Sequence, residues 1–177
     1  MDRYQLAKLV QWAAETPTGR LESRKRMQKV VFLLQCAGCP FNADYSLHYY
    51  GPYSSDVAQL TDELVQVGLL GEVASTNQVG KQFSYQLDAQ ATESITAYEG
   101  SAQGRSALDE LEPFADRAKQ LLKEDVPSLE YAATIAYFRT KGSSWDDAFQ
   151  KTCEFKRLAP ESAAGKYALK LATQFVD

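Results

Sequence analysis

The stretch at residues 45–55, which reads YSLHYYGPYSS, constrains the fold more than any other part of the chain. Its first residues alternate with a period of two, so we expect a short strand with one buried face. Gly51-Pro52 should end this strand, because glycine allows unusual backbone angles and proline fixes φ and lacks an N–H donor. Ser54 or Ser55 can then cap a helix that follows the corner.

Helical periodicity surrounds this corner. Apolar residues spaced three and four apart predict helices over residues 3–15, 22–37 and 55–68. The second of these helices is apolar on every side in its second half, which predicts that it is buried there. Two alternating runs at 72–75 and 81–87 flank a polar, glycine-containing turn and predict a β-hairpin. With the strand at the corner, these runs should form a three-stranded antiparallel sheet.

The remaining half of the chain has a helical pattern throughout. A short helix is expected at 91–98 and a long one at 105–124, where Pro113 should kink or split the helix because an interior proline costs about 3 kcal/mol. Further helices should begin near Ser128, Ser144 and Pro160.

The predicted fold class is therefore α+β and mostly helical. Residues 1–90 should form a winged-helix-like domain with three helices and the small sheet. Residues 91–177 should form a helical extension, a C-terminal bundle packed on that domain. Only one helix is expected between the corner strand and the hairpin, where a helix-turn-helix has two, which disfavours reading of a DNA groove.

Composition and charge narrow the function classes. The chain has 177 residues and a formal net charge of −4, which argues mildly against broad nucleic-acid binding. No apolar run approaches the roughly 20 residues that cross a bilayer, and the N-terminus lacks the pattern of a secretion signal. We therefore expect a cytoplasmic protein that is not bound to a membrane.

The cysteines and the single histidine are the residues to test for metal or nucleophilic chemistry. Cys36 and Cys39 form a CxxC pair at the C-terminus of a predicted helix, where the helix dipole disfavours a thiolate. A zinc site would need both of them together with Cys153 and His48. We expect buried structural thiols instead, with no metal and no cofactor. Because no nucleophile elbow or phosphate loop is present, we expect no catalytic residues and no enzyme.

The densest basic run lies around the start of the second predicted helix. Its members are Arg20, Arg24, Lys25, Arg26 and Lys29. They are a candidate patch for nucleic acid or an acidic partner, although a solvated helix face is the favoured interpretation. The helix at 55–68 carries Asp56, Asp62 and Glu63 and no lysine or arginine, so it should repel phosphates.

Three stretches carry a resemblance to a known family. They are MQKVVFLL at 27–34, HYYGPYS at 48–54 and the segment 64–70, which ends a helix in a Gly-Leu pair. Over roughly residues 1–90 the chain resembles the Panacea antitoxin-like family, including SocA-type proteolytic adaptors and YwgA-like proteins. The resemblance implies a small non-enzymatic regulator, often encoded with toxins or other defence genes, that acts by binding another protein.

The tyrosine-rich corner is the candidate partner-binding site, made of Tyr49, Tyr50, Pro52 and Tyr53 with Lys29 nearby. We expect the Lys29 ammonium to reach out from the edge of the core toward the tyrosine rings or a partner carboxylate. Aromatic residues beside a fixed turn suit a binding surface, but they also suit the packing of a core and a turn. Both interpretations stay open at this point.

Two function classes follow. The first is a non-enzymatic regulatory protein, antitoxin- or adaptor-like, which binds a protein partner such as a neighbour-encoded toxin or defence protein. The alternative is a winged-helix DNA-binding transcriptional regulator, which the order of the elements and the basic run support. Any binding of nucleic acid should be weak, and the sequence leaves open whether the chain forms a homodimer.

Overall fold

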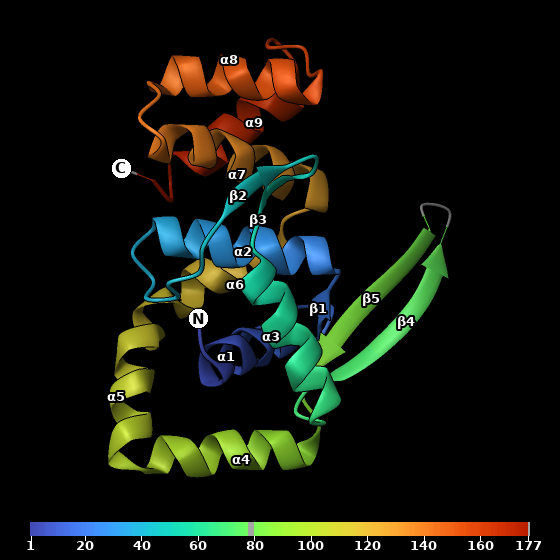
Figure 1. The fold of residues 1–177 in the computed structure, drawn as a ribbon, viewed down its shortest axis with the longest axis vertical. Coiled ribbons are helices and arrows are strands. Elements are labelled where there is room, and N and C mark those ends of the chain that lie inside the picture. The colour runs from blue at the N-terminus through green and yellow to red at the C-terminus, as the bar shows by residue number, and fades with distance from the viewer. Residues whose placement is uncertain (78–79, 177) are drawn as a thin grey trace.

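The structure is a computed structural model that describes residues 1–77 and 80–176. It confirms the α+β class, with a mostly helical body from one side of which the β4–β5 hairpin of a small antiparallel sheet projects (Figure 1). The helices are α1 (Arg3–Ala14), α2 (Arg24–Cys36), α3 (Ser55–Gln66), α4 (Ala89–Gly100), α5 (Ala102–Leu111), α6 (Ala115–Lys123), α7 (Val126–Thr140), α8 (Trp145–Lys156) and α9 (Ala163–Ala172). The strands are β1 (Leu21–Glu22), β2 (Ser46–His48), β3 (Gly51–Tyr53), β4 (Gly71–Asn77) and β5 (Gly80–Gln86).

The helices match the ranges expected from periodicity to within a few residues. Pro113 splits the long helix as predicted, since α5 ends at Leu111 and a 3-10 turn at Glu112–Phe114 separates it from α6. Ser54 caps α3 by accepting a hydrogen bond from the backbone N–H of Val57. Capping and the effect of a proline depend on residues that are close together in the chain, so both can be recognised from the sequence.

The three-stranded sheet has the order β1-β5-β4, and its β4–β5 hairpin confirms the predicted one. The predicted membership of the corner strand is wrong, because the third strand is β1, whose Leu21 pairs with Tyr85. Since β1 comes before α2, both α2 and α3 lie between it and the hairpin. The single helix expected between the corner strand and the hairpin is α3, so that prediction is confirmed.

The corner forms a separate two-stranded hairpin, in which β2 pairs with β3. Gly51 and Pro52 belong to β3 and do not end a strand, which corrects the predicted break. His48 pairs with Gly51, so Tyr49 and Tyr50 form the turn. Gly51 has a φ of +86°, a left-handed conformation that glycine adopts readily after a tight hairpin turn.

Helix α2 lies at the centre of the molecule. It packs against α6 and β1 as well as against α7, and Figure 1 shows α7, α8 and α9 stacked beyond it. The predicted burial of its second half is confirmed for Val30, Phe32 and Leu33, while Cys36 at its end is partly buried. One hydrophobic core runs from Leu6 to Phe175, so it contains residues of both predicted domains. Within the described ranges, no helix combines the length and apolar character needed to cross a membrane.

Candidate functional site

The β2–β3 hairpin is held at both ends by two glutamines of α2. The Gln28 side chain donates to the carbonyl oxygen of Ser54 at 2.8 Å and accepts from its N–H at 2.9 Å. The Gln35 side chain, two turns further along the helix, makes the same pair of bonds with Ala43 at 2.9 and 2.8 Å. Each backbone segment is therefore fixed by a side chain that both donates and accepts, as a neighbouring strand would.

Lys29 of α2 fixes the middle of the hairpin by a hydrogen bond to β3. Its side chain is only 2% exposed, and Nζ donates to the carbonyl oxygen of Pro52 at 2.6 Å. Burial lowers the pKa of this ammonium to about 8, and the carboxylate of Glu130 partly opposes the shift. The predicted outward reach of Lys29 is therefore wrong, because β3 covers the helix at this position. Pro52 is buried as well, so both residues lie beneath the predicted site and not on its surface.

The turn of the hairpin is fixed from the C-terminal half of the chain. Nζ of Lys156 donates to the carbonyl oxygen of Tyr49 at 2.8 Å and to Oε1 of Glu130 at 2.7 Å. Sequence reasoning missed this pair, since a lysine at the end of one helix and a glutamate in another look like ordinary surface charges. A Cβ on Gly51 would lie 2.5 Å from Oγ1 of Thr134, so glycine is also needed for the close approach of β3 to α7.

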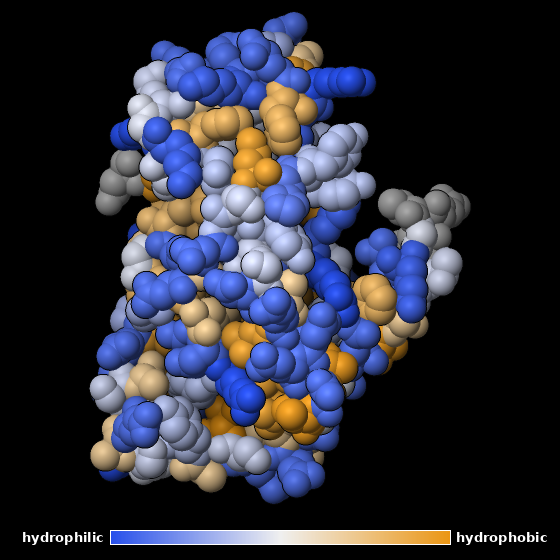
Figure 2. Space-filling view, viewed as in Figure 1, coloured by the Kyte–Doolittle hydropathy of each residue, from blue (hydrophilic) through white to orange (hydrophobic). Residues whose placement is uncertain are grey.

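Three tyrosine rings project from this held backbone, and we call them the tyrosine face. Tyr49, Tyr50 and Tyr53 are 81%, 49% and 36% exposed. The Tyr49 and Tyr50 rings meet edge to face at 5.0 Å, and the His48 ring lies 4.9 Å from that of Tyr53. Side chains of intermediate hydropathy gather over this part of the molecule (Figure 2). The exposure meets the condition that a partner-binding role requires, because rings packed only in the core would not reach solvent.

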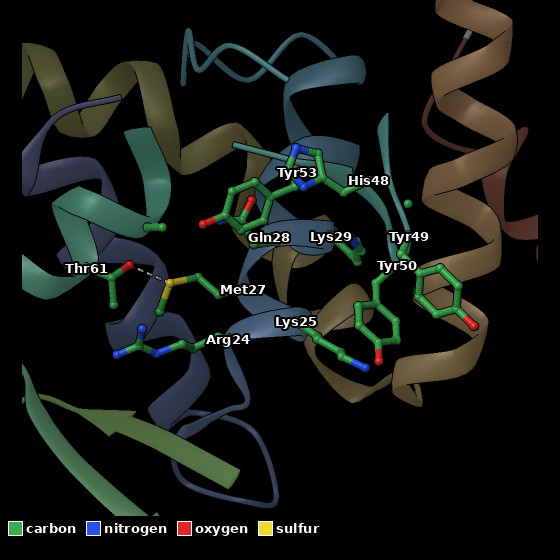
Figure 3. A pocket seen from close by; sticks show the side chains of 12 residues that line it. Arg24, Lys25, Met27, Gln28, Lys29, His48, Tyr49, Tyr50, Tyr53 and Thr61 are labelled. Atoms are coloured by element: carbon green, nitrogen blue, oxygen red, sulfur yellow. Dashed lines mark hydrogen bonds between the residues drawn. The ribbon is translucent and has the colours of Figure 1, made fainter. Parts of the chain in front are cut away.

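A pocket of about 310 Å³ opens between the tyrosine face, α2 and α3 (Figure 3). Met27 and Ala58 contribute apolar side chains to its lining, and Tyr50 and Tyr53 contribute their rings. Thr61 also lines it, with a hydroxyl that donates to the carbonyl oxygen of Val57 at 2.7 Å and lies 3.0 Å from the sulfur of Met27. The combination of apolar walls with a few polar groups is typical of a binding pocket.

The predicted basic patch is not one free surface. Arg24 forms ion pairs with Asp62 at 2.9 Å and with Glu72 at 3.0 Å. The partly buried Arg26 donates to the backbone carbonyls of Leu122 and Glu124. Of the remaining members, Lys29 is buried, Arg20 is exposed, and Lys25 is exposed with its Nζ over the Tyr50 ring, 3.4 Å from the centroid. The charges are dispersed because most of these side chains have structural partners.

The cysteines lie in the interior and do not converge. Cys39 and Cys153 are buried, Cys36 is partly buried, and all three are free thiols. Burial raises the pKa of the Cys36 and Cys39 thiols to about 12. Among the residues that the structure describes, no group of three or more histidine, cysteine or acidic side chains could hold a metal ion.

Comparison with known proteins finds one informative relationship. The chain is similar to the uncharacterized protein YwgA of Bacillus subtilis (strain 168), with 28% identity over 121 residues, which make up 68% of each chain. No protein-family model matches the chain. The similarity supports a relation to YwgA-like proteins, and it extends over more residues than the 90 or so to which the resemblance in sequence motifs was assigned.

Proposed function

We propose that the chain is a non-enzymatic regulatory protein, antitoxin- or adaptor-like, that acts by binding a protein partner through its tyrosine face. The observation that carries the proposal is that exposed tyrosine rings occur on a hairpin whose backbone is fixed by hydrogen bonds. Tyr49, Tyr50 and Tyr53 expose large amphipathic side chains, and tyrosine is enriched among the residues that dominate binding energy. The hairpin is held by Gln28, Gln35, Lys29 and Lys156, so little ordering is left for a partner to impose.

The resemblance to antitoxin-like proteins supports the same conclusion. The Gln28-Lys29 pair and the Tyr50-Gly51-Pro52 corner carry that resemblance, and in this fold Lys29 donates to Pro52 while Gln28 bonds to Ser54 just after the corner. Together these residues hold the hairpin against α2 and α7, so they do more than pack the core. A motif that maintains a surface loop is more informative about binding than one that maintains packing.

A DNA-binding regulator is the second candidate. It is favoured by the order of elements, since two helices lie between β1 and the β4–β5 hairpin, as in a winged helix with the β2–β3 hairpin inserted. Charge disfavours it, because α3 would be the recognition helix and carries Asp56, Asp62 and Glu63 without a lysine or arginine. Arg24, whose guanidinium reaches this helix, is already paired with its Asp62.

Co-expression with the protein encoded by a neighbouring gene tests the proposal. Wild-type chain should capture that protein, and Tyr49→Ala should abolish capture without lowering the melting temperature, because the ring is mostly exposed. Tyr167→Ala is the matched control, since that ring is 45% exposed on α9, away from the hairpin. Undiminished capture by both Tyr49→Ala and Tyr50→Ala would contradict a role for the tyrosine face.

A further inference from the structure

Positive charge gathers around the hairpin. Lys25 and Lys29 come from α2 and Lys156 comes from α8, and all three contact the segment from Tyr49 to Pro52. Within residues 1–77 and 80–176, Glu130 is the one carboxylate that pairs with any of these ammonium groups, and it pairs with Lys156. The pocket beside the hairpin therefore has an excess of cations in its surroundings, although the whole chain is acidic.

Two of these lysines also line the pocket. The Lys25 ammonium is exposed at its rim, lies over the Tyr50 ring, and forms no ion pair in the described part of the chain. Lys29 is almost fully buried in the wall, and an ammonium has three N–H donors, of which one is directed to Pro52. The exposed Lys25 ammonium can donate to an anion, and the buried charge of Lys29 adds to the positive potential there in a medium that screens charge weakly.

The rest of the lining is apolar and aromatic. Met27 and Ala58 face the pocket from two helices, while the rings of Tyr50 and Tyr53 stand on the hairpin side (Figure 3). The volume of about 310 Å³ lies at the lower end of the range for ligand pockets. Such a space suits one aromatic side chain and its immediate neighbour better than a large molecule.

We propose that this pocket binds a carboxylate joined to an aromatic group, which the partner protein presents as an acidic residue beside an aromatic one. The carboxylate meets Lys25 at the rim and is further stabilised by the buried positive charge of Lys29, and the aromatic group packs against Met27 and the tyrosine rings. The source of this ligand rests on the proposed function, whereas its chemistry rests on the pocket alone.

A titration without any partner protein tests the chemistry. We expect 3-phenylpropionate to shift the backbone amide signals of residues 48–51 and 53 in nitrogen–proton correlation spectra of the full chain. The isosteric 3-phenylpropanamide should bind about tenfold more weakly, because it cannot form charge-assisted hydrogen bonds. Lys25→Gln should weaken binding of the acid about threefold, as expected for an exposed cation, and leave the amide unchanged.

Lys81→Gln is the matched control, because that lysine also lies over an aromatic ring, 4.9 Å from the centroid of Phe83, but does not line the pocket. It should leave both titrations unchanged. Equal affinity for the acid and the amide, or equal effects of Lys25→Gln and Lys81→Gln, would overturn the inference. Failure of the proposed function is a separate result, because it appears only in the capture experiment with Tyr49→Ala.

Discussion

Nζ of Lys156 donates a hydrogen bond of 2.8 Å to the carbonyl oxygen of Tyr49, 107 residues earlier in the chain. The same ammonium pairs with Glu130, and the two side chains are only 6% and 15% exposed. An isolated two-stranded hairpin is marginally stable at best in water. The C-terminal helices therefore supply part of what keeps the tyrosine face in its observed position.

Lys156→Met should destabilise the fold by about 3 kcal/mol, because it leaves Glu130 as an unpaired, mostly buried charge. The double variant Lys156→Met, Glu130→Met should recover much of that loss, since apolar side chains of similar volume can replace a buried ion pair. Urea denaturation measures both free energies of unfolding. Simple additivity of the two single changes would contradict direct coupling between the side chains.

Gly51→Ala should be more destabilising than the same change at a glycine in open space. It introduces a Cβ that would lie 2.5 Å from Oγ1 of Thr134, and it strains a φ of +86°. Gly142→Ala is the matched control, since that residue has a φ of +93° with no atom near the added Cβ. We expect a loss of about 1 kcal/mol at Gly142 and at least about 2 kcal/mol at Gly51, measured by thermal or urea unfolding.

Combining Gly51→Ala with Thr134→Ala should restore part of the stability, because the clashing Oγ1 is then removed. Equal losses for Gly51→Ala and Gly142→Ala would show that the close approach of β3 to α7 is unimportant.

Stability should depend on pH through Lys29. Its pKa falls from 10.5 to about 8 on folding, so the unfolded chain binds more protons between these two values and the free energy of unfolding rises with pH there. From about pH 7.5 to about pH 9.5, wild type should gain about 2 kcal/mol relative to Lys29→Met, which lacks the titrating group. Tyrosine and surface lysine titrations occur in both proteins and cancel in the difference. Parallel pH profiles would contradict the burial of the charged group.

Duplex DNA should bind weakly, without sequence preference, and only at low salt. The physical reason is that Arg24 and Arg26 have partners within the fold and Lys29 is buried, so few cations are left to displace counterions. Fluorescence anisotropy with two unrelated duplexes at low and physiological salt measures this. Tight binding to one duplex that resists salt would favour the DNA-binding alternative.

The regular parts of the fold were predictable because their signals are local. Apolar spacing predicted α1, α2 and α3, and Pro113 predicted the break between α5 and α6. Strand β1 was missed because two residues are too few to show alternation. The β2–β3 hairpin was missed because its turn is Tyr49-Tyr50, which lacks the glycine or asparagine of the common two-residue turns.

The candidate site was predictable in part. The exposure of the tyrosine face follows from a turn rich in amphipathic residues, and it was anticipated as a condition for binding. The buried position of Lys29 was not predictable. Helical periodicity places this residue at the margin of the apolar face of α2, and it cannot show that β3 crosses over it. The pairing of Glu130 with Lys156 depends on how α7 and α8 pack, which leaves no mark in the local sequence.

The hydrogen bond between Lys156 and Tyr49 also has a consequence for protein synthesis. The hairpin leaves the ribosome early, whereas α7 and α8, which support its turn, follow about a hundred residues later. At about 5–20 residues per second, several seconds pass between the two events. During that interval the nascent chain has the contacts of the hairpin with α2 but not the bond from Lys156 that fixes its turn. If the proposed function holds, a partner that requires the fixed turn is recognised only once α8 has emerged, so that incomplete chains do not compete for it.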